Sequence, residues 1–237
     1  PAVLELGGSD PSIVLADANP EKAADVLTLS RIINAGQSCI AAKRIIVEAR
    51  VYEKMKTLMS EKLGALKLGD PALDETDVGP IARKDLRATL DRQVRSTISE
   101  GATCLLGGEV PNRDGYFYPV TLLADVEPGM TAFKEETFGP IGVLIEARDE
   151  EHALSLANDT EFGLAASVWT KTGVLPTSRS DPSAFGPDAL TGQTIYDFDD
   201  FNDVLEMTKD IATTTAHYFH QQCAFASENP FYSGISQ

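Results

Sequence analysis

The chain has 237 residues, of which 43% are hydrophobic and 24% are charged, and its formal net charge is −16. This composition is ordinary for a globular protein with a sizeable core, in one large domain or two small ones. The negative charge argues against nucleic acid or an anionic membrane surface as a partner. No apolar run approaches the roughly 20 residues that span a bilayer, and no signal-peptide pattern opens the chain.

The three cysteines, Cys39, Cys104 and Cys223, are odd in number and widely spaced. This usage argues against a disulfide framework and favours a reducing compartment, so we expect a cytoplasmic protein. The chain begins at Pro1 without a methionine, which is consistent with a fragment or a processed product.

Strand patterns and helix patterns alternate over the first 171 residues. Short apolar runs predict strands, and apolar residues at helical spacing predict helices. The predicted strands are residues 1–6, 12–15, 44–47, 103–106, 116–123, 140–146 and 165–169. The predicted helices are residues 20–36, 51–66, 84–100 and 150–158, with a polar loop at 69–80 and an irregular segment at 130–137. The alternation indicates an α/β protein with a mainly parallel sheet.

The pattern changes after Trp169. Residues 170–192 are rich in Gly, Pro, Ser and Thr with almost no periodicity, which predicts a long loop or a linker. A helix is compatible with residues 199–222, and the final residues favour neither state.

Cys39 lies in the run Gly-Gln-Ser-Cys, between a predicted helix and a predicted strand. A turn of this kind can present a thiol to a cleft as a nucleophile, although an arbitrary cysteine is more often a small buried residue. Three other patterns accompany it: Glu-Leu-Gly-Gly at residues 5–8, Glu-Glu-Thr-Phe-Gly-Pro at 135–140, and the segment 158–164. Glu5 precedes Cys39 by 34 residues.

At these residues, and in the Ile-Ala-Ala-Lys-Arg run after Cys39, the sequence resembles the NAD(P)-dependent aldehyde dehydrogenase superfamily. Within it, the sequence is most similar to the succinate-semialdehyde dehydrogenase type. The resemblance covers about residues 1–171 and implies a three-layer α/β catalytic domain with a mainly parallel sheet. Residues 172–237 do not match and are expected to form an irregular or helical C-terminal tail. The implied reaction is oxidation of a small aldehyde, such as succinate semialdehyde, to the carboxylic acid with NAD or NADP.

The resemblance implies catalytic roles for Cys39 and Glu5. Cys39 would attack the aldehyde as a thiolate, giving a thiohemiacetal and then a thioester. Glu5 would act as the general base for water that hydrolyses the thioester, a role favoured if burial raises its pKa. The backbone N–H of Cys39 would supply half of an oxyanion hole.

The same resemblance implies that the cofactor contacts Glu136 through its ribose and Phe138 beside the nicotinamide, with Leu6 and Gly7 also at the cofactor. Most of the cofactor site is expected on a Rossmann-like domain upstream of Pro1, since no Gly-x-Gly-x-x-Gly loop occurs here. We therefore expect impaired activity from the isolated chain. The family is usually homo-oligomeric, but no oligomerisation segment is recognisable in this sequence.

Two alternatives to an oxidising enzyme remain open. One is a non-catalytic relic or interaction protein that retains the fold. The other is an aldehyde-reactive thiol module in which Cys39 reacts without hydride transfer. Reactivity at Cys39 separates the first alternative from an enzyme, and formation of NADH separates the second.

The remaining candidate residues favour structural roles. Cys104 is expected to be inert core, and Glu135 a solvated surface charge. The pair at 43–44, Lys-Arg, could contact a substrate carboxylate, but salt-bridged surface residues are favoured. His217, His220 and Cys223 share one face of the possible helix at a spacing that zinc can use, but they lack a fourth ligand, so we predict no metal site.

Overall fold

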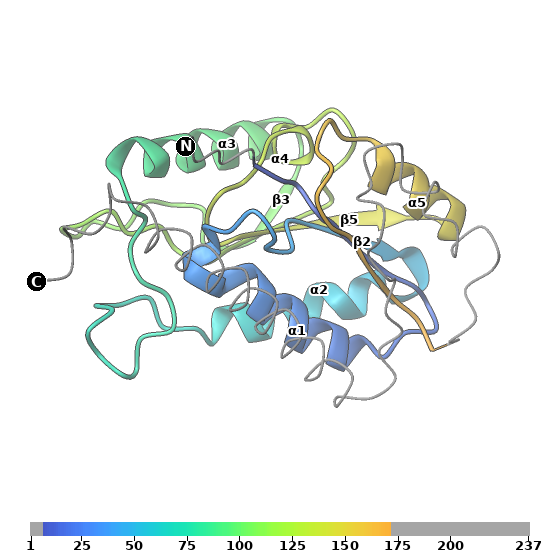
Figure 1. The fold of residues 1–237 in the computed structure, drawn as a ribbon, viewed down its shortest axis with the longest axis horizontal. Helices are drawn as coiled ribbons and strands as arrows, with labels where there is room; N and C mark the ends of the chain where they lie inside the picture. Colours follow the sequence, from blue (N-terminus) through green and yellow to red (C-terminus); the bar gives the residue numbers. More distant parts are fainter. Residues whose placement is uncertain (1–6, 172–237) are drawn as a thin grey trace, which may run out of the picture. The chain divides into compact units, whose positions relative to one another are not determined.

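The computed structural model describes residues 7–171 (Figure 1). The strands are β1 (Pro11–Val14), β2 (Arg44–Glu48), β3 (Thr103–Leu106), β4 (Thr121–Ala124), β5 (Ile141–Ala147) and β6 (Ser167–Trp169). The helices are α1 (Pro20–Ile32), α2 (Ala49–Gly64), α3 (Lys84–Ser99), α4 (Thr131–Lys134) and α5 (Glu150–Asn158), with a 3₁₀ turn, η1 (Ile33–Gly36). The strand predicted at 1–6 and the helix predicted at 199–222 lie outside the described residues.

The six strands form one sheet in the order β3-β4-β5-β2-β1-β6. All neighbours are parallel except β3, which pairs antiparallel with β4 at one edge. Helices α1 and α2 cover one face of the sheet, and α3, α4 and α5 cover the other (Figure 1). The predicted α/β class, with three layers and a mainly parallel sheet, is therefore confirmed for residues 7–171.

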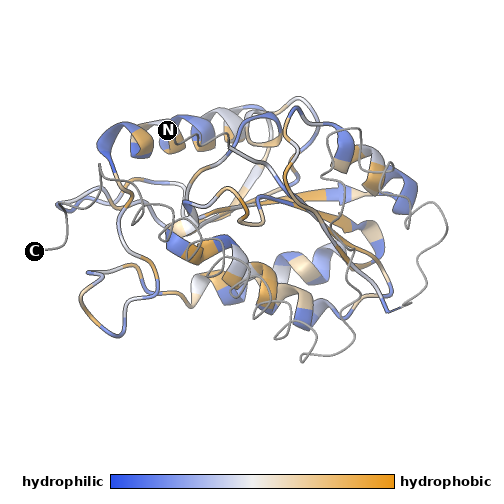
Figure 2. Cartoon of the chain, viewed as in Figure 1, coloured by the Kyte–Doolittle hydropathy of each residue, from blue (hydrophilic) through white to orange (hydrophobic). Residues whose placement is uncertain are grey.

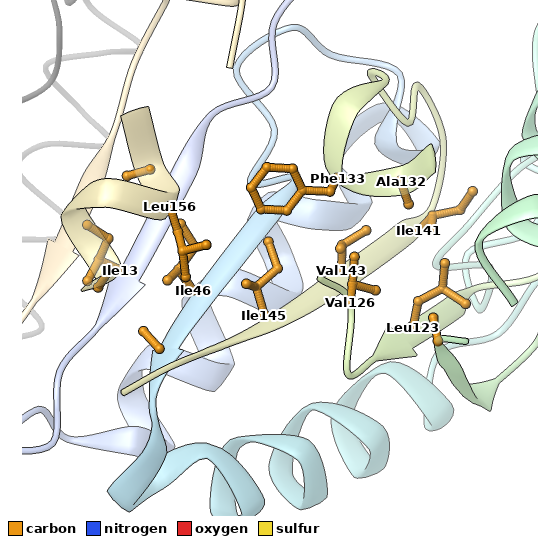
Figure 3. Packing of buried hydrophobic residues seen from close by; sticks show 14 of the residues in the cluster. Ile13, Ile46, Leu123, Val126, Ala132, Phe133, Ile141, Val143, Ile145 and Leu156 are labelled. Atoms are coloured by element: carbon orange, nitrogen blue, oxygen red, sulfur yellow. The ribbon is translucent and has the colours of Figure 1, made fainter. Parts of the chain in front are cut away.

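Both faces of the central strands are buried, which explains their nearly continuous hydrophobic sequences. Successive residues of β5 alternate: Val143 and Ile145 join the hydrophobic cluster that contains Phe133 of α4 and Leu156 of α5, as Figure 3 shows. Leu144, between them, is also buried but lies outside that cluster. Figure 2 shows that the central strands are hydrophobic, whereas the helices carry both hydrophilic and hydrophobic residues.

Two predicted boundaries are wrong. The strand predicted at 116–123 is reduced to β4, Thr121–Ala124, because the preceding residues run through a loop in which Tyr116 pairs its carbonyl with Ile81 N–H. The helix predicted at 20–36 begins at Pro20, with Asn19 as its N-cap, but its α-helical part ends at Ile32. The segment 130–137, predicted as irregular, contains the short helix α4. The remaining predicted helices and strands differ from the observed ones by no more than about two residues at either end, the usual uncertainty of helix and strand limits.

The early end of α1 has a local cause in η1. Asn34, Ala35 and Gly36 all have positive φ values, of 51°, 54° and 73°, which an α-helix cannot contain. The buried guanidinium of Arg31 donates to the carbonyls of Gly36 (2.6 Å) and Ala42 (3.3 Å), and so holds the turn against the start of β2. Arg31 thus supplies hydrogen bonds to main-chain carbonyls after the point where the helix can no longer continue.

Gly36 is required at this turn by its neighbours as well as by its φ. A Cβ atom at Gly36 would collide with the main chain of Gly139 and would lie 2.8 Å from Pro140 N. The turn before Cys39 therefore sits directly on the backbone that leads into β5, at a separation that only glycine allows.

We predict that Gly36→Ala lowers the free energy of unfolding by about 2 kcal/mol more than Gly129→Ala does. Gly129 is the matched control, since its φ is also positive (99°) but a Cβ there would meet nothing within 4 Å. Gly129→Ala thus reports backbone strain alone, whereas Gly36→Ala adds the collision with Gly139. Urea denaturation of both variants measures the difference, and equal losses would contradict the close approach.

Candidate active site

The candidate site lies along one edge of the sheet, at the amino ends of four neighbouring parallel strands. Segment 7–10 leads into β1, segment 39–43 into β2, segment 136–140 into β5 and segment 159–166 into β6. Because parallel strands start at the same edge, these four segments meet although they are far apart in sequence. All four overlap patterns that the sequence singled out, which are marked by Gly7, Cys39, Glu136 and the segment 158–164.

Glycines allow the closest of these approaches. A Cβ on Gly7, whose φ is 76°, would lie 2.7 Å from Glu136 Oε2, and a Cβ on Gly8 would lie 2.8 Å from the carbonyl oxygen of Cys39. The N–H of Gly8 also donates to Glu136 Oε1 over 3.1 Å. The Gly-Gly pair thus packs between the Glu136 carboxylate and the main chain of Cys39.

Lys43 also contacts both the Glu136 carboxylate and the main chain of Cys39. Its ammonium donates to the carbonyls of Ser38 (2.9 Å) and Cys39 (2.8 Å) and lies 3.4 Å from Glu136 Oε1. The Lys43 side chain is only 1% exposed. The expectation of a surface salt bridge is therefore wrong for Lys43, because its partners are main-chain carbonyls and a carboxylate inside the fold.

The same expectation is wrong for Arg44. Its guanidinium is buried and donates to the carbonyls of Ser9 (3.0 Å), Leu156 (2.8 Å) and Ala157 (2.9 Å). It thereby satisfies the carbonyls at the end of α5 and joins that helix to the segment before β1. Arg44 is a structural cross-link and is not available to a substrate carboxylate.

The two neighbouring glutamates differ in their surroundings. Glu135 is part-exposed and forms an ion pair with Arg92 (2.7 Å) and a hydrogen bond with Gln93 (2.9 Å), as a surface charge would. The hydrogen bond from Arg92 keeps the pKa of Glu135 below its usual value. The Glu136 side chain is 19% exposed and turns toward Gly8 and Lys43 instead. Phe138, two residues on, is half-buried.

The two described cysteines are both partly buried. Cys104 donates weakly to the carbonyl of Leu106 (3.4 Å) and packs against the main hydrophobic cluster. Burial raises the pKa of the Cys104 thiol, which favours its unreactive form. Cys39 lies instead in the turn at the sheet edge, next to the exposed Ile40. Glu5, Leu6, His217, His220 and Cys223 lie outside the described residues.

Asp10 is a buried charge that the sequence analysis missed. It is 5% exposed, and its Oδ1 accepts a hydrogen bond from Ala165 N (3.0 Å), while Oδ2 is buried and has no hydrogen-bond partner among residues 7–171. Burial raises its pKa to about 6, although Ala165, Lys43 and Arg44 act in the opposite direction. The signal available in the sequence was an aspartate directly before a proline and a buried strand. Asp10 joins the segment before β1 to the segment before β6.

We predict that Asp10 makes the protein less stable as the pH rises from about 4 to about 6. The folded-state pKa of Asp10, about 6, lies above its ordinary value of 3.8, so the folded protein binds more protons than the unfolded chain in this range. Relative to Asp10→Asn, the wild type should lose up to about 3 kcal/mol of unfolding free energy across this interval and no more at higher pH. Urea titrations of both proteins at several pH values measure this, and parallel pH profiles would contradict it.

Within residues 7–171, no group of three or more His, Cys, Asp or Glu side chains is arranged to hold a metal ion. In the same part of the chain, none of the helices combines the length and apolar character needed to cross a membrane.

The comparisons with known proteins agree with this arrangement. Residues 1–175 match the model of the aldehyde dehydrogenase family. The chain is 51% identical over 168 residues to the Escherichia coli (strain K12) succinate semialdehyde dehydrogenase (NAD(P)+) Sad, which covers 71% of this chain and 36% of that protein. It is 39% identical over 195 residues to the succinate-semialdehyde dehydrogenase (NADP(+)) of Mycobacterium avium (strain 104), with 82% and 41% covered.

Solved structures give the same result. Lactaldehyde dehydrogenase from Escherichia coli superposes with a TM-score of 0.68 at 36% identity, over 71% of this chain and 35% of that one. A Mycobacterium tuberculosis aldehyde dehydrogenase complexed with NAD+ superposes with a TM-score of 0.68 at 34% identity, over the same shares. The chain spans between 36% and 43% of the length of the curated relatives that it matches. The match over most of its residues shows that this chain belongs to the aldehyde dehydrogenase family.

Proposed function

We propose that residues 1–171 are the catalytic-domain portion of an NAD(P)-dependent aldehyde dehydrogenase that oxidises an aldehyde to a carboxylic acid. The observation that carries the proposal is the meeting of three segments that the sequence marked separately. Gly8 N–H reaches Glu136 Oε1 across 128 residues of sequence, and Gly8 also packs against the carbonyl of Cys39. These contacts support one site built from all three segments.

In this proposal Cys39 is the nucleophile. Its thiolate adds to the aldehyde carbon, and the carbonyl electron pair moves to the oxygen, giving a thiohemiacetal. The turn that carries Cys39 is held by two hydrogen bonds, from Arg31 to the Gly36 carbonyl and from Lys43 to the Cys39 carbonyl. A turn that is fixed at several main-chain atoms suits a nucleophile, because its position need not be organised during the reaction. The N–H of Cys39 would stabilise the oxyanion.

The residues beside Cys39 fit the nicotinamide end of a dinucleotide. Glu136 Oε1 is occupied by Gly8 and Lys43, but within residues 7–171 no hydrogen bond is directed at Oε2, which can accept from ribose hydroxyls. Gly7 presents no side chain next to Oε2, and the half-buried Phe138 offers an aromatic surface. When bound, the nicotinamide would accept a hydride from the substrate carbon. Glu136, Phe138, Leu6 and Gly7 are therefore proposed as cofactor contacts.

Hydrolysis of the resulting thioester requires a base, and we assign this role to Glu5. Glu5 precedes Gly7 by two residues, and Gly7 lies against Glu136. Glu5 would take a proton from water as the water oxygen attacks the thioester carbon, and the Cys39 thiolate would leave. For the substrate we propose a semialdehyde such as succinate semialdehyde, since two relatives from different bacteria carry that name.

We predict that Cys39 is alkylated at least about tenfold faster than Cys104 at pH 7. Burial raises the pKa of the Cys104 thiol, whereas Cys39 lies at the sheet edge beside an exposed residue. Iodoacetamide labelling followed by peptide mass spectrometry gives both rates from one sample and keeps Cys223 separate. Equal rates at Cys39 and Cys104 would count against a nucleophilic role and favour a non-catalytic protein.

Turnover can be tested in a chimera in which the matched segment of this chain replaces its counterpart in the Escherichia coli relative. We predict NAD(P)H formation from succinate semialdehyde, reduced about a thousandfold or more by Cys39→Ser. Glu5→Gln should retain one rapid turnover of NAD(P)H and then stall, because the thioester forms but is not hydrolysed. Cys104→Ser is the matched control and should leave the rate unchanged. Full activity in the Cys39→Ser chimera would refute the assignment.

A further inference from the structure

Two aspartates attach the short strand β6 to its neighbour β1, one at each end. Asp10 precedes β1, and its Oδ1 accepts from the N–H of Ala165, shortly before β6 begins. Asp17 follows β1, and its carboxylate accepts from Thr170 Oγ1 (2.9 and 2.7 Å) and from Lys171 N–H (3.3 Å), directly after β6 ends. These side-chain hydrogen bonds extend the attachment beyond the three residue pairs that join the two strands.

The Asp10 hydrogen bond also holds the connection from α5 to β6, which is formed by residues 159–165. Among residues 7–171, it is the only hydrogen bond that joins this connection to anything beyond itself and α5. The connection nevertheless packs against the candidate site. Phe162 Cε1 lies 3.6 Å from the place that a Cβ on Gly7 would take, and Leu164 Cδ2 lies 3.1 Å from the corresponding place on Gly8.

Burial of the Asp10 carboxyl group has a cost in stability. One of its oxygens is buried and has no hydrogen-bond partner among residues 7–171, and such a group loses its hydration without full compensation. Burial raises the pKa of Asp10 to about 6 against the effects of Ala165 N–H, Lys43 and Arg44, and Glu136 adds to the increase. An apolar side chain would avoid this cost, but it could not accept a hydrogen bond from Ala165.

We propose that Asp10 is a positioning residue that holds residues 159–165 against the Gly7–Gly8 pair and thereby maintains the cofactor side of the candidate site. A Cβ on Gly7 would lie 2.7 Å from Glu136 Oε2, the oxygen assigned above to the cofactor ribose. Movement of Phe162 away from Gly7 therefore changes the surroundings of that oxygen. This inference rests on the proposed function and adds a residue that acts through the 159–165 connection.

Hydrogen exchange in the full chain tests whether Asp10 holds this connection. We expect Asp10→Ala to accelerate exchange of the Ala165 amide by at least about tenfold, because that N–H loses its acceptor. Asp10→Asn should keep this rate within about threefold of the wild type, since its side-chain oxygen can accept the same hydrogen bond. Amides in β5 report global unfolding, so the acceleration at Ala165 should exceed any acceleration in β5 by about tenfold.

Asp17→Ala is the matched control, because it removes a carboxylate from the other end of β6. It should accelerate exchange at Lys171 but leave the Ala165 rate within about threefold of the wild type. If Asp10→Ala does not fold, Asp10→Ser takes its place, since its hydroxyl is one bond too short to reach the Oδ1 position. An unchanged Ala165 rate in Asp10→Ala, or an equal acceleration in Asp10→Asn or Asp17→Ala, overturns the holding role.

The chimera described above tests the consequence for the cofactor. Asp10→Ala should raise the KM for NAD(P)+ by at least about fivefold while kcat changes by less than about twofold. Asp10→Asn should restore the KM, because the hydrogen bond requires an acceptor and not a charge. An unchanged KM in Asp10→Ala, or an equal increase in Asp10→Asn, overturns the link to the cofactor.

The proposed function can fail separately. A chimera with the wild-type segment that forms no NAD(P)H refutes the proposed function, and the link from Asp10 to the cofactor is refuted with it. Hydrogen exchange at Ala165 still decides whether Asp10 holds residues 159–165, so the two failures can be told apart.

Discussion

The carboxylate of Glu136 accepts from Gly8 N–H and pairs with Lys43, and the candidate site depends on this one tie. Three segments, each leading into a different parallel strand, meet at a single oxygen. The sheet order makes the tie possible, because β5, β2 and β1 are consecutive neighbours and all start at the same edge. Glycines at positions 7, 8 and 36 then let the backbones approach closely enough for the tie to form. The strand order thus brings the three segments together, and their side chains then connect them.

The site lies at the amino ends of these strands, whereas open α/β sheets commonly bind ligands beyond the carboxyl ends. The difference has a physical basis in the residues. The segments that lead into these strands interact through main-chain groups. Buried cationic side chains donate hydrogen bonds to their carbonyls: Arg31 to Gly36, Lys43 to Cys39, and Arg44 to Ser9. These cations compensate loop carbonyls that a sheet or a helix would have satisfied. The rigid edge that results can hold a nucleophile in place.

Most of the fold could be predicted from the sequence, because hydrophobic periodicity and end signals such as Asn19 and Pro20 act locally. The helix before Cys39 was predicted too long, since it ends in three residues with positive φ whose turn is held by tertiary contacts of Gly36 with Arg31 and Gly139. The environment of Lys43 could not be predicted either. A lysine beside an arginine normally indicates surface, and only the tertiary positions of Cys39 and Glu136 turn it into a buried donor. Asp10 was also missed, because its burial and its hydrogen bond from Ala165 depend on tertiary contacts. The site roles of Cys39, Glu136 and Phe138 stay predictions carried by resemblance, and for Cys39 and Glu136 they are now supported by shared contacts with Gly8 and Lys43.

The contacts between the Cys39 turn and residues 136–140 have a consequence for the order in which the protein folds. Gly36 packs against Gly139, and Gly8 hydrogen-bonds Glu136, so both early segments find some of their contacts in residues 136–140. Closing loops of this size precedes any gain from the contacts, which slows folding of such topologies. During synthesis, the turn that carries Cys39 therefore lacks this part of its support until residues 136–140 have left the ribosome. The Cys39 thiol therefore acquires its final surroundings only after the segment before β5 has been made.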